Sequence, residues 1–170
     1  MKKIIALLMI CSSSLAQDKF SYDSNTITDF IVIDTPGASS DIYKKAVNWI
    51  KENYVNPDDV ILMQMENEKI RFQGFKKQFH CMSSVCSDAT YIIEISFKDG
   101  KYKFDPISLK LSAGAGSFDV PLTDLKPYHD KKGELKKGSK EALDSIVNLF
   151  NSLQLSFDGY LTGKTKKEDW

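Results

Sequence analysis

The sequence has few of the side chains that carry enzyme chemistry, and it has no excess of charge. It holds two histidines and three cysteines in 170 residues, and its 23 basic side chains balance 23 acidic ones. A near-neutral chain lacks the positive surface that binds nucleic acid or attracts a protein to anionic membranes. We therefore expect no nucleic-acid partner.

The sequence also lacks any apolar run long enough to span a bilayer. Its one early apolar run, Ile4–Ile10, follows two lysines and precedes a small-x-small motif that ends at Ala16, which is the pattern of a secretory signal peptide. A buried N-terminal helix is the alternative, and a lipid anchor on Cys11 is disfavoured because the preceding residue is large. We expect an exported protein, periplasmic or extracellular after cleavage near Ala16, with no transmembrane segment in the mature chain.

Cleavage near Ala16 leaves 154 of the 170 residues, with 21 rather than 23 basic side chains against 23 acidic ones. That length is typical of one domain and is enough to bury a core. We predict a signal peptide over residues 1–16, a single α+β domain over residues 17–160 that begins with a loose polar lead-in, and a flexible C-terminal tail over residues 161–170.

Removal of the signal peptide leaves two cysteines, Cys81 and Cys86. An even pair in an exported protein indicates a disulfide, here across a hairpin loop. A loop this short loses little entropy on closure, so the bridge would stabilise the fold by roughly 2 kcal/mol. The alternative is a zinc site that adds His80 and His129 to the cysteines. Export and the hairpin spacing favour the disulfide, and we predict no metal and no cofactor.

Two stretches have the spacing of amphipathic helices. Over residues 41–54 apolar side chains recur every three to four residues, with lysines on the opposite side. We expect Ser39 or Ser40 to cap this helix and Trp49 to anchor its packing. A second helix, with a regular apolar stripe, follows Ser139, which is its expected N-cap.

Apolar patterns predict five strands, at residues 30–33, 60–65, 68–75, 91–98 and 101–111. The runs at 30–33 and 60–65 are apolar at consecutive positions, which is typical of strands covered on both faces. Gly74 is expected to form a bulge, because the apolar phase changes after it.

Asp99-Gly100 predicts a type I′ hairpin turn between the last two strands. That turn pairs Phe97 with Tyr102 and places the apolar side chains of both strands on one face. Pro106 falls opposite Ile93, and we expect the register to slip there because proline cannot donate to the ladder.

Residues 112–138 differ in kind, because they are rich in glycine, proline and lysine. Apart from a short strand within residues 117–122, they are expected to form a long connection, and such loops are usually functional or mobile. Tyr128 and His129 in this connection form a polar-aromatic patch, which is one candidate site. The alternative is that they are ordinary exposed loop residues.

The order of elements is strand, helix, four strands, helix, which predicts an α+β fold with an antiparallel sheet and both helices on one face. The other face would then be open. It is our main candidate for ligand binding, with solvated polar side chains as the alternative. The residues expected there are Gln64, Arg71, Gln73, Glu94, Ser96 and Lys103, with Leu62 and Ile92 as apolar spots.

Part of the sequence resembles a known family. The stretch Ile42–Trp49, the pair Asn53-Tyr54, the 60–65 strand and Ile70–Gly74 are similar to the domain of unknown function 4468, a group of exported Bacteroidetes proteins. The resemblance covers about residues 26–111. It implies a TBP-like β-α-β(4)-α fold with a curved antiparallel sheet. That family has no established active site, so the resemblance implies no catalytic residue, and the fold name does not imply DNA binding.

These observations favour an exported protein of unknown molecular function. We expect a non-catalytic binding or protein-interaction domain of the bacterial envelope, whose partner is an unidentified protein or small ligand. One alternative is a hydrolase that uses His80 or His129, which requires that a histidine meet a carboxylate or hydroxyl in a pocket. Another is a structural subunit of an envelope assembly.

Overall fold

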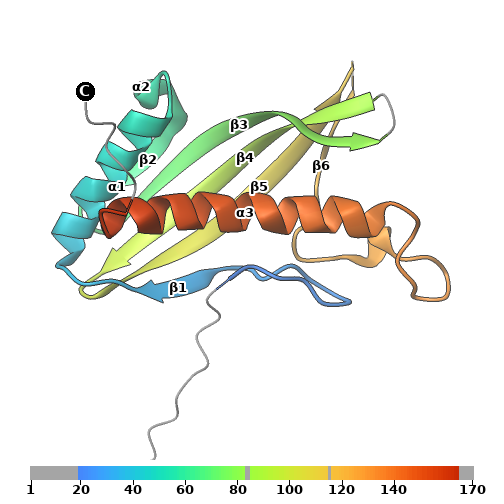
Figure 1. The fold of residues 1–170 in the computed structure, drawn as a ribbon, viewed down its shortest axis with the longest axis horizontal. Helices are drawn as coiled ribbons and strands as arrows, with labels where there is room; N and C mark the ends of the chain where they lie inside the picture. The colour runs from blue at the N-terminus through green and yellow to red at the C-terminus, as the bar shows by residue number, and fades with distance from the viewer. Residues whose placement is uncertain (1–18, 83–84, 115, 165–170) are drawn as a thin grey trace, which may run out of the picture.

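The computed structural model describes residues 19–82, 85–114 and 116–164. The predicted signal peptide and most of the predicted C-terminal tail lie outside this part of the chain. Figure 1 shows a curved sheet with the long helix α3 (Ser139–Leu161) lying across one face and α1 (Ser39–Asn53) at one end of that face. The predicted α+β class, with both helices on one side of an antiparallel sheet, is confirmed.

The sheet has six antiparallel strands in the order β1-β5-β4-β3-β2, with β6 paired to the free edge of β5. The four-stranded meander was predicted, and so was a short strand within the long connection. Strand bounds are β1 Ile31–Asp34, β2 Ile61–Met65, β3 Lys69–Met82, β4 Val85–Lys98, β5 Lys101–Ala113 and β6 Gly116–Asp119, and the short helices are α2 Pro57–Val60 and η1 Lys126–Tyr128.

The β4–β5 register is the predicted one, with Phe97 opposite Tyr102, Pro106 opposite Ile93 and an irregularity beside that pair. The predicted type I′ turn is wrong. Gly100 has a φ of 77°, but Asp99 is not among the non-glycine residues with positive φ, so the turn is not type I′. Asp99 instead uses its carboxylate to accept a hydrogen bond from the Ser39 amide at 2.8 Å, at the start of α1.

The predicted N-caps are therefore wrong for both helices. The N-cap residue of α1 is Ala38, whose side chain cannot form a capping hydrogen bond. The free amide of Ser39 instead donates to the carboxylate of Asp99, which lies 60 positions away in the sequence. At α3 the N-cap is Gly138 in a left-handed conformation, with no side-chain cap, and Ser139 is already the first helical residue.

Gly74 forms no bulge, which corrects the prediction. It pairs with Tyr91 in regular register, and the irregularity falls later, between Lys76 and His80, where Gln78 has a φ of 51°. A Cβ at position 74 would overlap the ring of Tyr91. The glycine is therefore needed because an aromatic ring from the neighbouring strand lies directly over it.

The two apolar runs predicted as fully covered strands, β1 and β2, are edge strands. Leu62 and Met65 of β2 are exposed, and so is Phe30 just before β1. The prediction failed because consecutive apolar residues do not show whether a strand is covered on both faces. In an edge strand, some of these apolar side chains can remain exposed. The sequence prediction also placed the start of β2 at Val60. Val60 is instead the last residue of the short helix α2, which begins with Pro57 at its first helical position.

The core lies between the helices and the sheet, with Trp49 near its centre. The indole is about 1% exposed and packs at 5.6 Å from the ring of Phe72 on β3 and at 5.3 Å from that of Phe157 on α3. Its role as the packing anchor of α1 is confirmed. Large aromatic surfaces of this kind contribute most of the apolar burial of a small domain.

The N-terminal lead-in and the long connection are both better fixed than predicted. Phe20 is buried between Phe104 and Phe150, and its amide and carbonyl both bond the side chain of Asn151 on α3. In the connection, Leu125 is fully buried, and its amide bonds the carbonyl of Asn25. These two segments therefore close one side of the core together.

Candidate functional site on the open sheet face

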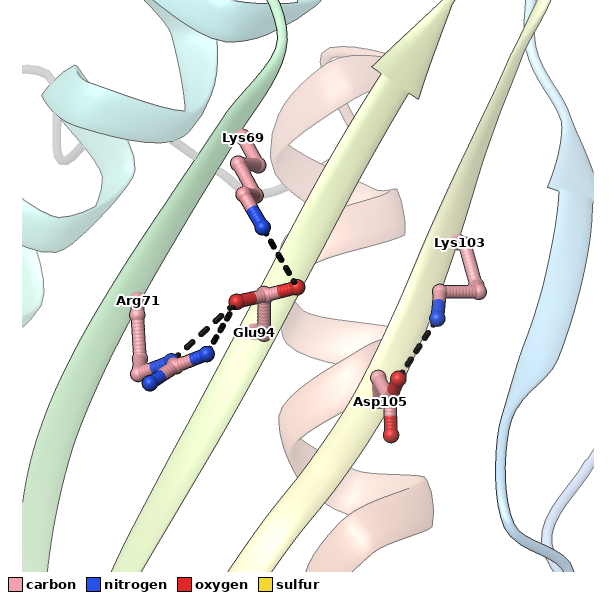
Figure 2. A network of polar contacts seen from close by, with 5 residues as sticks. All are labelled: Lys69, Arg71, Glu94, Lys103 and Asp105. Atoms are coloured by element: carbon pink, nitrogen blue, oxygen red, sulfur yellow. Dashed lines mark hydrogen bonds and ion pairs between the residues drawn. The ribbon is translucent and has the colours of Figure 1, made fainter. Parts of the chain in front are cut away.

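The face of the sheet turned away from α3 carries a row of charged side chains. Figure 2 shows Lys69 and Arg71 of β3, Glu94 of β4, and Lys103 and Asp105 of β5 on the near side of the sheet, with α3 behind it. The register explains the arrangement, because Arg71, Glu94 and Asp105 are direct cross-strand neighbours. Three residues predicted for this face, Arg71, Glu94 and Lys103, are thus together on it.

Gln64 is not on this face, which corrects the prediction. Its Oε1 accepts a hydrogen bond from the hydroxyl of Tyr43 on α1 at 2.9 Å, so the side chain lies toward the helices. The cause is a register shift in β2 between Ile61 and Met63, which reverses the expected alternation. Met65, opposite Lys69, occupies the open face instead.

Glu94 is the centre of the charged row. It is only 7% exposed, yet one carboxylate oxygen accepts from Arg71 Nε at 3.1 Å and from Nη2 at 2.7 Å, and the other lies 3.6 Å from Lys69 Nζ. A buried carboxylate is costly unless it is paired and hydrogen-bonded, and here both conditions hold. The network therefore fixes these side chains rather than leaving them free.

Lys103 is engaged as well. Its ammonium lies 2.6 Å from Asp105 and 4.9 Å from the ring centroid of Phe30. A partly exposed pair on one strand contributes little stability, but it neutralises both groups locally. Of the polar residues predicted to bind a ligand here, Arg71, Glu94 and Lys103 already satisfy one another or a neighbour.

Several exposed side chains around the paired charges are apolar. Phe75, on β3 beyond Arg71, is 59% exposed, and Phe30 and Met65 are 47% and 43% exposed. Gln73 lies between Arg71 and Phe75 on the same face and is exposed, and its side chain makes no hydrogen bond within the described residues. An arrangement of paired charges with exposed aromatic and thioether side chains suits contact with another protein surface.

One hollow on this face has a different character. It measures about 340 Å³ and is bordered by Val32, Ser96 and three lysines, Lys98, Lys101 and Lys103. Neither Lys98 nor Lys101 has an ion pair in the part of the chain that the structure describes. This end of the face is therefore positive, whereas its centre is neutralised by pairing.

The two histidines lie elsewhere. His80 Nδ1 is 3.2 Å from Ser145 Oγ on α3, so one histidine does meet a hydroxyl at a cavity, as the hydrolase alternative requires. Ser145, however, donates its proton to the carbonyl oxygen of Glu141 at 2.8 Å. The serine is then the acceptor from the imidazole, and a nucleophile needs the opposite direction of proton transfer.

His129 Nδ1 bonds the carbonyl oxygen of Leu125 at 2.9 Å, and no carboxylate holds it within the described residues. Tyr128 beside it packs partly against the core, and burial raises the pKa of its phenol. The predicted Tyr128–His129 patch is therefore largely committed to the packing of the connection. Among the described residues no cluster of three histidine, cysteine or acidic side chains could hold a metal ion.

Cys81 and Cys86 form a disulfide between paired positions of β3 and β4, as predicted. Both sulfurs are thereby removed from any metal site. Such bridges are typical of proteins in oxidising compartments. No helix of the described chain is long and apolar enough to cross a membrane.

Comparison with solved structures tests the family resemblance. The chain has the fold of a DUF4468 family protein. It aligns with the crystal structure of a DUF4468 family protein from Bacteroides ovatus with a TM-score of 0.64, 15% sequence identity, and coverage of 83% of this chain and 88% of that one. No family model matches the sequence, and no curated protein matches it significantly. At this identity the likeness concerns the fold alone, and the TBP-like description stays a prediction.

Proposed function

We propose that this protein is an exported interaction domain that binds a partner protein through its open sheet face. The observation that carries the proposal is that three exposed apolar side chains, Phe30, Met65 and Phe75, surround the paired charges of Glu94. The predicted signal peptide and the Cys81–Cys86 disulfide support export.

The composition of the face supports a protein partner more than a small ligand. Aromatic and methionine side chains are enriched where proteins bind each other, and arginine in a fixed orientation is a frequent anchor. Arg71 is held by two bonds to Glu94 and is still 37% exposed at its side chain. A partner can therefore cover it without paying the entropy of ordering it first.

The charge on the face indicates one property of the partner. In the hollow bordered by Lys98, Lys101 and Lys103, the ammonium groups of Lys98 and Lys101 have no ion pair among the described residues, whereas Lys103 is paired with Asp105. A partner with acidic side chains at one edge of its contact surface would complement it, while an apolar patch would cover Phe75 and Met65. The two ends of the face would then set the orientation of binding.

Site-specific photo-cross-linking tests the proposal. A photoreactive amino acid replaces Gln73 on the open face, and in a matched control it replaces Leu155, which is 64% exposed on α3. Irradiation of the cells that produce the protein should give one discrete heavier adduct from position 73 and none from position 155. Adducts of equal yield from both positions, or none from either, would contradict the proposal.

The mass of the adduct separates the proposal from one of its alternatives. An adduct with a different protein supports the interaction domain. An adduct of twice the protein's own mass would instead mean that the face joins two copies of this chain, as expected for a structural subunit.

A further inference from the structure

A second cavity lies on the helix side of the sheet, near the disulfide hairpin. It measures about 200 Å³ and brings together five elements: β3, β4, β5, β6 and α3, with η1 beside them. Its walls are chiefly apolar, and include Phe79, Leu111, Phe118, Tyr128 and Ile146. It is distinct from the open face, because Leu111 and Ile146 belong to the core under α3.

His80 is one of the few polar side chains in this wall, together with Ser87 and the phenol of Tyr128. Its Nδ1 faces Ser145 Oγ, and the proton of Ser145 is already donated to Glu141. In the neutral imidazole Nδ1 must then carry the proton and donate it to Ser145, which leaves Nε2 as a bare acceptor. Nε2 is buried and has no hydrogen-bond partner among the described residues.

A buried acceptor without a partner is unfavourable, and such groups in native proteins are usually satisfied by a ligand or an ordered water. Because Nδ1 is bonded to α3, Nε2 lies on the other side of the ring. The complement of this site is a molecule with one O–H or N–H donor and an apolar body. The donor satisfies Nε2, and the body fills the space between Phe79, Leu111 and Ile146.

The size of the cavity limits that body to about one ring. An apolar protein cavity of about 150 Å³ is enough to hold benzene, and this one is slightly larger. Val85 and Phe118, which are 60% and 57% exposed, line it from the surface side. They provide an apolar entrance through which a small aromatic molecule can pass from solvent.

We propose that this cavity is a binding site for a single-ring ligand of the phenol class, whose hydroxyl donates a hydrogen bond to His80 Nε2. Nothing in the fold comparison assigns such a site. The inference is independent of the proposed function, because none of the cavity's lining residues lies on the open sheet face.

Two probes of matched shape, phenol and toluene, test the proposal by calorimetric titration of the oxidised protein. Phenol should bind with a Kd of about 1 mM or tighter, a reasonable affinity for so few atoms. In the His80→Leu variant the ratio of the phenol Kd to the toluene Kd should rise about tenfold, the effect expected for loss of one hydrogen bond. The His129→Leu variant is the matched control, and its ratio should equal that of the unmodified protein.

Two further measurements keep the test decisive if a variant folds poorly. In the unmodified protein, phenol but not toluene should shift the Nε2 nitrogen resonance of His80. Ala142→Leu, which fills the cavity from α3, should abolish binding of both probes. The proposal is overturned if neither probe binds, if the Kd ratio is the same with and without His80, or if Ala142→Leu leaves binding intact.

Discussion

The two faces of the sheet are built from the same strands in opposite ways. On the helix side, Phe72, Ile93 and Phe104 are fully buried against α1 and α3. On the other side, the intervening residues Arg71, Glu94 and Asp105 hold one another by ion pairs or pair with a neighbouring lysine. One face is therefore stabilised by apolar area, and the other by charges that cancel locally.

The difference shows that a polar face is not automatically a polar binding site. The alternation of the sequence correctly placed Arg71, Glu94 and Lys103 on the open face, but it did not show that they are already paired. Once they are paired, the exposed side chains that remain are apolar ones such as Phe75 and a few polar ones, chiefly Lys98 and Lys101 at one end. The helix face should therefore dominate stability, and the open face should matter mainly for binding.

The largest expected effect comes from removing the aromatic centre of the helix face. Trp49→Ala should lower the free energy of unfolding by about 3–5 kcal/mol, because it opens a cavity among Tyr54, Phe72 and Phe157. Urea denaturation measures this loss. Leu155→Ala, at an exposed position of the other helix, should change stability by no more than about 0.5 kcal/mol.

Alkaline pH should weaken the helix face selectively. Burial raises the pKa of Tyr54 and of Tyr91, whose hydroxyls bond each other at 3.0 Å. Their stabilising contribution is therefore full below the unfolded pKa near 10, and it is lost as pH rises because only the unfolded chain ionises. Between about pH 9 and about pH 11 Tyr54 alone should lower the free energy of unfolding by about 1.4 kcal/mol, and Tyr91, whose pKa is also raised by burial, should add to that loss.

Tyr54→Phe provides the control for that pH dependence. It removes one ionising group with a strongly raised pKa, so the alkaline loss measured by denaturant titration at each pH should be smaller by about 1.4 kcal/mol. An unchanged slope of stability against pH would mean that the buried phenols do not cause the loss.

A smaller loss of stability is expected at Gly74, where the strand backbone lies against the ring of Tyr91 on the helix face. Gly74→Ala should cost about 2–3 kcal/mol, because its Cβ would overlap the ring of Tyr91. Gly116→Ala is the matched control, since a Cβ there meets only ordinary contacts. If the overlap is the cause, the double variant with Tyr91→Ala should cost clearly less than the two single variants together.

The smallest effect on stability should come from the open face. Glu94→Gln leaves Arg71 and Lys69 without their shared carboxylate and should cost about 1–2 kcal/mol. Lys103→Gln, which breaks the more exposed pair with Asp105, should cost about 0.5 kcal/mol or less. If Glu94→Gln lowered the free energy of unfolding as much as Trp49→Ala, the proposed difference between the two faces would be wrong.

Local sequence signals predicted the parts of the fold that depend on neighbours in the chain. The Asp99-Gly100 turn and the alternation around it were enough to predict the β4–β5 register, and the cysteine spacing was enough for the disulfide. The helical spacing around Trp49 likewise identified the face of α1 that is buried.

The failures concern contacts between distant residues. The cap of α1 comes from Asp99 rather than from Ser39 or Ser40, and Phe20, an isolated aromatic in a polar stretch, is in the core because Phe104 and Phe150 surround it. Gln64 was placed on the wrong face because a one-residue register shift leaves no mark in the apolar pattern.

The candidate sites show the same division. Sequence alternation could mark the open face, but only the structure places His80 beside Ser145, which is 65 residues away, and leaves its Nε2 without a partner. The local sequence around His80 cannot predict this site, because the residues that surround the histidine come from α3 and from the long connection.

We propose that the open face binds a partner, whereas the helix face holds the fold together. The most direct test measures the cross-link yield from position 73 after Phe75→Ser, with Leu155→Ser as control, both being exposed apolar residues. Phe75→Ser should lower the yield at least about fivefold while its unfolding free energy stays within about 0.5 kcal/mol of the unmodified protein. An unchanged yield from the Phe75→Ser protein would contradict this proposal.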